Sequence, residues 1–148
     1  MKNLKELLEH ELQDMYSAET QLVDALPKMA KAANHPSLKK AIEMHLKETE
    51  VQVGRLEKAA KILGISPKNE KCKGMEGLIK EGEKLIGEKP KPEVLDAGLI
   101  GAAQKVEHYE IAAYGTACYY AKMLGEKEVA TLLGQTLDEE KKADEKLN

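Results

Sequence analysis

The chain has 148 residues, 42% of them hydrophobic and 33% charged, with a formal net charge of −3. This length suits one domain over residues 1–148, and the apolar content excludes a chain that is disordered by composition. No apolar run approaches the roughly 20 residues that span a bilayer, and lysines and glutamates are interspersed rather than grouped in a basic stripe. We therefore expect no membrane partner and no nucleic-acid partner. Because no apolar leader opens the chain, we also expect a cytoplasmic location.

All five aromatic residues are tyrosines, so the apolar content is mainly alanine, leucine, isoleucine, valine and methionine. These residues suit close-packed helices better than sheets. Apolar positions recur at spacings of three, four and seven along most of the chain, which indicates amphipathic helices. No alternating pattern competes with them, and the predicted fold class is all-α.

The first half of the chain predicts a helical hairpin. Its first helix spans residues 4–31, and Pro27 is expected to kink or loosen the last turn rather than abolish it. The second helix begins at Pro36, a favourable first residue of a helix, and stops at Gly64. The link between the two is short, so the helices are expected to be antiparallel neighbours.

The second half predicts another hairpin, with a third long helix from residue 92 to about residue 125 and a fourth from about residue 126. The link over residues 64–91 carries a short, glycine-rich amphipathic helix. A link of this length can return along the bundle, as the single crossover of ferritin-like bundles does. We therefore predict a ferritin-like four-helix bundle with a short extra helix in the crossover between the second and third long helices.

Acidic residues fall on or beside the apolar face of every long helix. Residues three, four or seven positions apart share a helix face, so these carboxylates are predicted to point into the bundle interior. The candidates are Glu19, Glu48, Glu107, Glu110, Glu140 and Asp144.

The spacing of these residues repeats between the two halves. From Glu19 to Glu110 is 91 positions, and from Glu48 to Glu140 is 92. The same shift places Gln52 on Asp144. The pattern resembles two copies of one hairpin, each contributing a comparable set of oxygen ligands.

A buried cluster of carboxylates must be neutralised, because each unpaired buried charge costs several kcal/mol. Three solutions exist: protonation at raised pKa values, pairing with basic side chains, or binding of metal cations. The lysines and Arg55 are expected on outer faces, away from the acids. A pair of cations best explains carboxylates that arrive from all four helices at one level.

The chain resembles the YciF-like branch of ferritin-like bacterial stress proteins over nearly its whole length. The segments that carry the resemblance are residues 16–19 (YSAE), 45–50 (HLKETE), 72–79 (CKGMEGLI), 102–116 (AAQKVEHYEIAAYGT) and 137–141 (LDEEK). The resemblance implies a ferritin-like bundle, a homodimer, a stress-response role and a carboxylate-bridged site for two Fe or two Mn ions. It places the metal ligands at the six acidic residues named above.

One feature departs from the wider di-metal ferritin-like enzymes, which use a Glu-x-x-His motif on two helices. Three residues after Glu48 stands Val51, and three after Glu140 stands Ala143. The site would therefore be rich in oxygen ligands unless a histidine from elsewhere reaches it.

Five further side chains are candidates for the surroundings of the site. His45 and His108 are candidates either as ligands or as hydrogen-bond donors that fix a carboxylate. Gln52 is expected to partner a ligand, and Tyr16 and Tyr114 either hydrogen-bond the site or pack with their phenol rings.

These residues predict a protein whose two Fe or Mn ions react with a small oxidant, peroxide or dioxygen. The alternative is a non-enzymatic stress or interaction protein in which the interior acids are empty or vestigial. A third interpretation, an iron store, is weaker because no residues identify the outer contacts that a cage requires.

Overall fold

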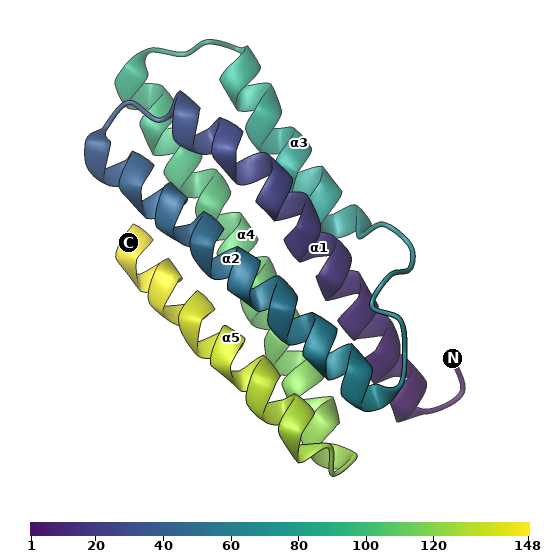
Figure 1. Ribbon diagram of the computed structural model, residues 1–148. Helices are drawn as coiled ribbons and strands as arrows, with labels where there is room; N and C mark the ends of the chain where they lie inside the picture. The colour runs from purple at the N-terminus through teal and green to yellow at the C-terminus, as the bar shows by residue number, and fades with distance from the viewer.

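The computed structural model describes all 148 residues and contains five helices and no strand (Figure 1). Helix α1 (Leu4–Ala32) pairs with α2 (Pro36–Leu63), and α4 (Pro92–Met123) pairs with α5 (Lys127–Leu147). The two hairpins pack side by side, α1 on α4 and α2 on α5, and the short helix α3 (Lys73–Gly87) covers α1 and α4 from outside. The predicted all-α bundle with a crossover helix is confirmed, and the helix ends lie within two residues of those predicted.

Local sequence signals explain where the helices begin and end. The Asn3 side chain accepts a hydrogen bond from the backbone N–H of Glu6 and so caps α1. Helix α1 continues through Pro27. Gly64 (φ 73°) and Gly125 (φ 74°) adopt the left-handed conformation at the end of α2 and before α5, which a side chain would strain.

The interior has two apolar regions. The lower core, at the lower right of Figure 1, takes buried residues from all four long helices, among them Leu8, Leu12, Leu56, Tyr114 and Leu133. All four long helices therefore close this end of the bundle.

The upper core lies at the opposite end and is closed differently. It is built by α1, α2 and α4 with Cys72 and Met75 from the start of α3, and it includes no residue of α5. The last turns of α5 therefore lie beside the upper core without contributing to it.

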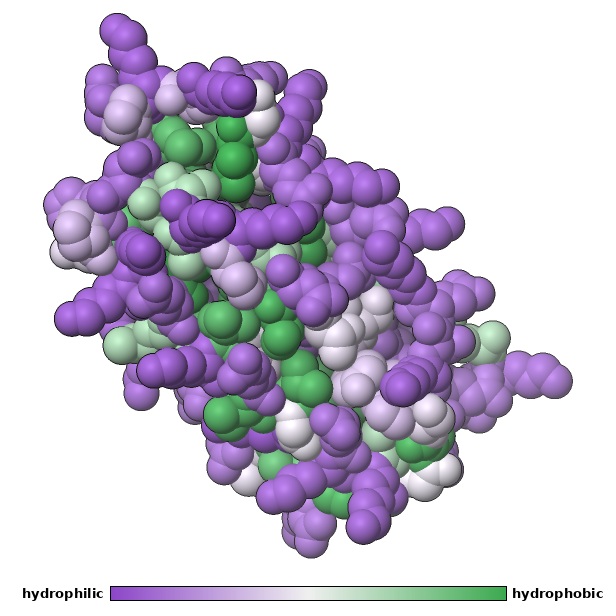
Figure 2. Space-filling model, turned by 45° about the horizontal axis from the view of Figure 1, so that its top comes forward, coloured by the Kyte–Doolittle hydropathy of each residue, from purple (hydrophilic) through white to green (hydrophobic).

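The face of the molecule in Figure 2 is mostly hydrophilic, with hydrophobic residues in a band between hydrophilic side chains. None of the five helices is both long and apolar enough to span a bilayer.

Candidate metal centre

A polar layer separates the two cores. Glu19 comes from α1, His45 from α2, Glu107 and Glu110 from α4, and Glu140 from α5. The four glutamates are 0–2% exposed and His45 is 8% exposed. We call these five residues the glutamate layer. They are buried because each falls on the same helical face as leucines, alanines or tyrosines of the neighbouring cores.

Four of the five side chains of this layer converge on one point. His45, Glu107, Glu110 and Glu140 each offer one ligand atom, and these atoms lie within 4.8 Å of one another. Nε2 of His45 is 3.0 Å from Oε1 of Glu107 and 3.9 Å from Oε2 of Glu140, without the alignment of a hydrogen bond. Glu19 accepts a hydrogen bond of 3.2 Å from the Tyr114 hydroxyl.

Most polar atoms of the layer have no hydrogen-bond partner. This holds for both oxygens of Glu107, Glu110 and Glu140, for Oε1 of Glu19 and for Nε2 of His45. Buried polar atoms in proteins are almost always paired, and each exception needs an explanation. Here the unpaired atoms are the oxygen and imidazole donors that iron and manganese accept, so the residues fit a metal centre.

Burial controls the charge of these carboxyl groups. Loss of hydration raises the pKa of Glu107 to about 7 and that of Glu19 to about 7. Loss of hydration and the nearby Glu107 raise the pKa of Glu140 to about 8. The pKa of Glu110 lies well above its ordinary value, first through burial and then through repulsion by Glu19 and Glu140. Without a cation, the layer therefore holds protons at neutral pH.

The neighbouring Glu139 shows the opposite behaviour. Its carboxylate accepts hydrogen bonds of 2.7 and 2.8 Å from the two terminal nitrogens of Arg55, and one of 3.1 Å from Gln52. The Arg55 guanidinium lowers the pKa of Glu139. This pair ties α2 to α5 and occupies the arginine. The ion pairs of the lysines involve Glu9, Glu76 and Glu81, none of which belongs to the glutamate layer. The sequence reasoning placed Arg55 on an outer face and missed this partner.

The structure places four of the six predicted ligands in the glutamate layer and the other two, Glu48 and Asp144, at its edge, where both raise the pKa of Glu107. Glu48 is half-buried and lines a cavity beside the layer. Asp144 is half-buried, and its Oδ1, a buried atom without a hydrogen-bond partner, lies 3.1 Å from Nε2 of the exposed His108. His108 thus contacts Asp144 rather than the buried glutamates.

The remaining predicted side chains surround the layer in different ways. Gln52 is buried and donates to Glu139 rather than to a buried glutamate. Tyr114 both packs in the lower core and donates to Glu19. Tyr16 packs against the lower core, as the packing interpretation expected, and forms no hydrogen bond with the layer.

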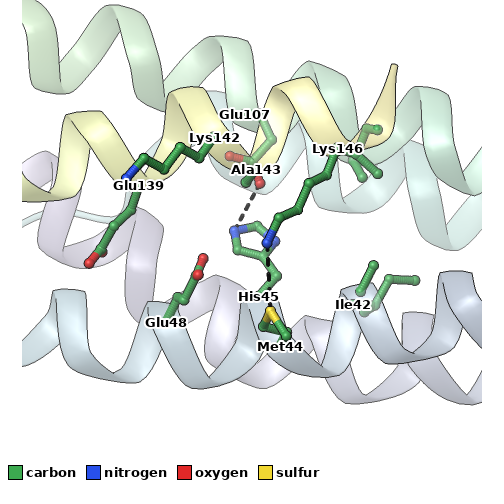
Figure 3. Close-up of a pocket in the computed structure, with 12 residues that line it drawn as sticks. Ile42, Met44, His45, Glu48, Glu107, Glu139, Lys142, Ala143 and Lys146 are labelled. Carbon is green, nitrogen blue, oxygen red and sulfur yellow. Dashed lines mark hydrogen bonds and ion pairs between the residues drawn. The ribbon is translucent and has the colours of Figure 1, made fainter.

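A cavity of about 250 Å³ opens between α2, α4 and α5, beside the last turns of α5 (Figure 3). We call it the α5 cavity. The buried His45 and Glu107 lie at its inner end, so it leads to the glutamate layer. The exposed Lys142 and Lys146 of α5 line its outer part, and the Lys146 amine lies 3.9 Å from the sulfur of Met44 on α2. The periodicity of the sequence did not predict this cavity.

The antiparallel bundle, its crossover helix and the buried donors on four helices define the class of ferritin-like helical bundles with a candidate metal centre. Within this class, the chain belongs to the family described as domain of unknown function DUF892, which matches residues 3–148.

Individual relatives agree with this assignment. The chain is 47% identical to Protein YciF of Escherichia coli (strain K12), over 99% of this chain and 89% of that protein. The crystal structure of the E. coli stress protein YciF superposes with a TM-score of 0.96, covering 99% of this chain and 93% of that one, at 47% identity. YcfI of Rhodopseudomonas palustris gives a TM-score of 0.97 at 42% identity, covering 100% of this chain and 94% of that one.

Proposed function

We propose that the glutamate layer binds two Fe or two Mn ions, and that the protein reacts them with peroxide or dioxygen under stress. One observation carries the proposal: His45, Glu107, Glu110 and Glu140 place ligand atoms within 4.8 Å of one another while their buried oxygens lack partners. A cation in this position would satisfy these oxygens and remove the cost of their burial.

Charge balance favours two ions over one. Glu19, Glu107, Glu110 and Glu140 carry four negative charges when ionised, and two divalent cations carry four positive ones. Seven of the eight oxygen atoms of these carboxylates have no hydrogen-bond partner, more than the six ligands of one octahedral ion. Glu48, half-buried beside the layer, is a further acidic side chain within the predicted ligand set.

The surrounding residues prepare the layer for this role. The Tyr114 hydroxyl fixes one oxygen of Glu19, which leaves the other oxygen free for a cation. The lower core closes one side of the layer to water, while the α5 cavity gives access from the other side. Bound Fe(II) or Mn(II) would supply electrons to an oxidant at an open coordination position.

The relatives support the physiological part of the proposal. YciF of E. coli is described as a stress protein, and the chain matches it over nearly its full length. A homodimer, which the sequence resemblance implies, belongs to the same proposal. Light scattering would test it directly.

The test is metal loading followed by oxidant consumption in matched variants. Glu110→Gln removes one charge from the layer, whereas Glu57→Gln removes one exposed charge on α2. We expect Fe(II) to stabilise the wild type and Glu57→Gln against heat and both proteins to consume peroxide. Glu110→Gln should lose both properties, because a four-carboxylate site cannot be completed.

Metal analysis of protein purified without chelator separates this proposal from the non-enzymatic alternative. Less than about 0.2 metal per chain, with no thermal shift on adding Fe(II) or Mn(II), would overturn the proposal. The raised pKa values of Glu107 and Glu140 would then describe a protonated, empty cluster.

A further inference from the structure

The α5 cavity is larger than a small oxidant needs. Its volume of about 250 Å³ equals roughly eight water molecules at about 30 Å³ each. Peroxide and dioxygen contain two heavy atoms. The space therefore fits a molecule of about eight heavy atoms, close to the lower limit of ordinary ligand pockets.

The walls of the cavity are apolar along most of their length. Ile42 of α2, Ala103 of α4 and Ala143 and Leu147 of α5 line it. The alanines create the space, since a larger side chain at either position would fill it. Such walls favour a hydrocarbon body.

The charged groups differ between the two ends. Lys142 and Lys146 are exposed and line the outer part, where Lys142 extends toward Glu139 and Lys146 toward Met44 (Figure 3). Of the carboxylates that face the cavity, Glu139 is already paired with Arg55. Glu107 lies buried beside His45 at the inner end, and Glu48 is one turn along α2 from that histidine. An anionic group is thus attracted at the mouth and repelled inside.

We propose that the α5 cavity binds a small amphiphilic carboxylate, with its charged head between Lys142 and Lys146 and its hydrocarbon body against the alanine walls. The far end of this molecule would lie next to His45 and Glu107. That it is a substrate or regulator of a metal centre rests on the proposed function, whereas the binding itself does not.

Hexanoate is the probe, because it has eight heavy atoms, and 1-hexanol is its neutral counterpart. Binding is followed by NMR chemical-shift changes of the metal-free protein near neutral pH. We expect hexanoate to bind about five- to tenfold more tightly than hexanol, because only the carboxylate pairs with the lysines. Lys142→Ala/Lys146→Ala should abolish this preference, while Lys141→Ala, on the same helix but outside the cavity, should keep it.

A second variant tests the walls. Ala143→Leu fills the space and should weaken both probes, with its fold verified by circular dichroism. Equal binding of hexanoate and hexanol, or equal losses in Lys141→Ala and the double lysine variant, would overturn the proposal. So would shifts that leave the amides of Ala103 and Ala143 unchanged. Glu110→Gln should still bind hexanoate, so a failed metal site and a failed carboxylate site give different results.

Discussion

The lower core and the glutamate layer are adjacent slices through the same four helices, yet they contain opposite chemistry. Leu56 and Leu133 lie in the first, 0% and 1% exposed, and Glu110 and Glu140 lie in the second, 2% and 0% exposed. Burial of the leucines stabilises the fold, about 2 kcal/mol or more for each side chain. Burial of the glutamates costs free energy unless they are protonated or bind cations. A bundle can thus contain a layer of buried ligands because the adjacent apolar core stabilises the fold.

A change of pH should affect the glutamate layer and the lower core most differently. In the metal-free protein the folded pKa of Glu107 is about 7, above its ordinary value of about 4.3. The folded state therefore holds more protons than the unfolded state. The resulting contribution to the free energy of unfolding is fully present below the ordinary pKa and is lost as the pH rises through the folded pKa values of about 7 to 8. Glu107 alone accounts for about 2 to 3 kcal/mol between pH 5 and pH 8, and Glu19 and Glu140 add to it.

Urea unfolding of the metal-free protein at pH 5 and at pH 8 measures this effect. We expect a loss of at least about 3 kcal/mol at the higher pH. With saturating Fe(II) or Mn(II), the free energy of unfolding should rise with pH instead, because cations bind the ionised carboxylates. A free energy of unfolding that is constant or rises with pH would contradict the assignment of raised pKa values to the layer.

The next largest effect belongs to the lower core. Leu56→Ala removes a side chain that is 0% exposed and should cost about 3 kcal/mol. The loss should be similar at pH 5 and pH 8, and metal binding per folded chain should be unchanged. A loss of metal affinity in this variant would show that the two layers are not independent.

A smaller effect of opposite sign is expected in the glutamate layer. Glu110→Gln should raise the stability of the metal-free protein at pH 8 by about 1 to 2 kcal/mol, because the amide is neutral without a proton, whereas the buried Glu110 carboxyl, with its raised pKa, must hold one in the folded state. The exposed Glu57→Gln is the matched control and should change little. If Glu110→Gln instead lowered the free energy of unfolding and the protein still bound metal, the claim that burial of this glutamate costs free energy would be wrong.

The smallest effect concerns the contact between the layers. Tyr114→Phe removes the donor to Glu19 and should cost about 1 kcal/mol, while Tyr119→Phe, at a residue 61% exposed, should cost almost nothing. Unfolding curves at one pH compare the two. Equal changes in the free energy of unfolding for both variants would show that the Tyr114 hydroxyl does not stabilise the glutamate layer.

The helices could be predicted closely because their ends carry strong local signals. Pro36 and Pro92 begin helices, and Gly64 and Gly125 adopt the left-handed conformation that ends or separates them. The glutamates at positions 19, 110 and 140 could be placed inside because their helical neighbours are apolar over several turns. These properties depend on residues close in sequence.

The arrangement of the site depends on features that periodicity does not contain. His45 and Glu48 lie one turn apart on α2, and only the rotation of the helix decides that His45 enters the layer while Glu48 lines the cavity. Asp144 of α5, with its Oδ1 buried, contacts the exposed His108 of α4, a contact set by the packing of these two helices. Arg55 finds Glu139 across the α2–α5 interface, a pairing set by tertiary packing.

The central claim is that the glutamate layer holds cations, and anomalous diffraction tests it most directly. Crystals grown with Fe(II) or Mn(II) would be measured on both sides of the metal absorption edge. We predict two peaks inside the bundle, bounded by Glu19, His45, Glu107, Glu110 and Glu140. Anomalous density absent from this layer, or present only between His108 and Asp144, would contradict the account.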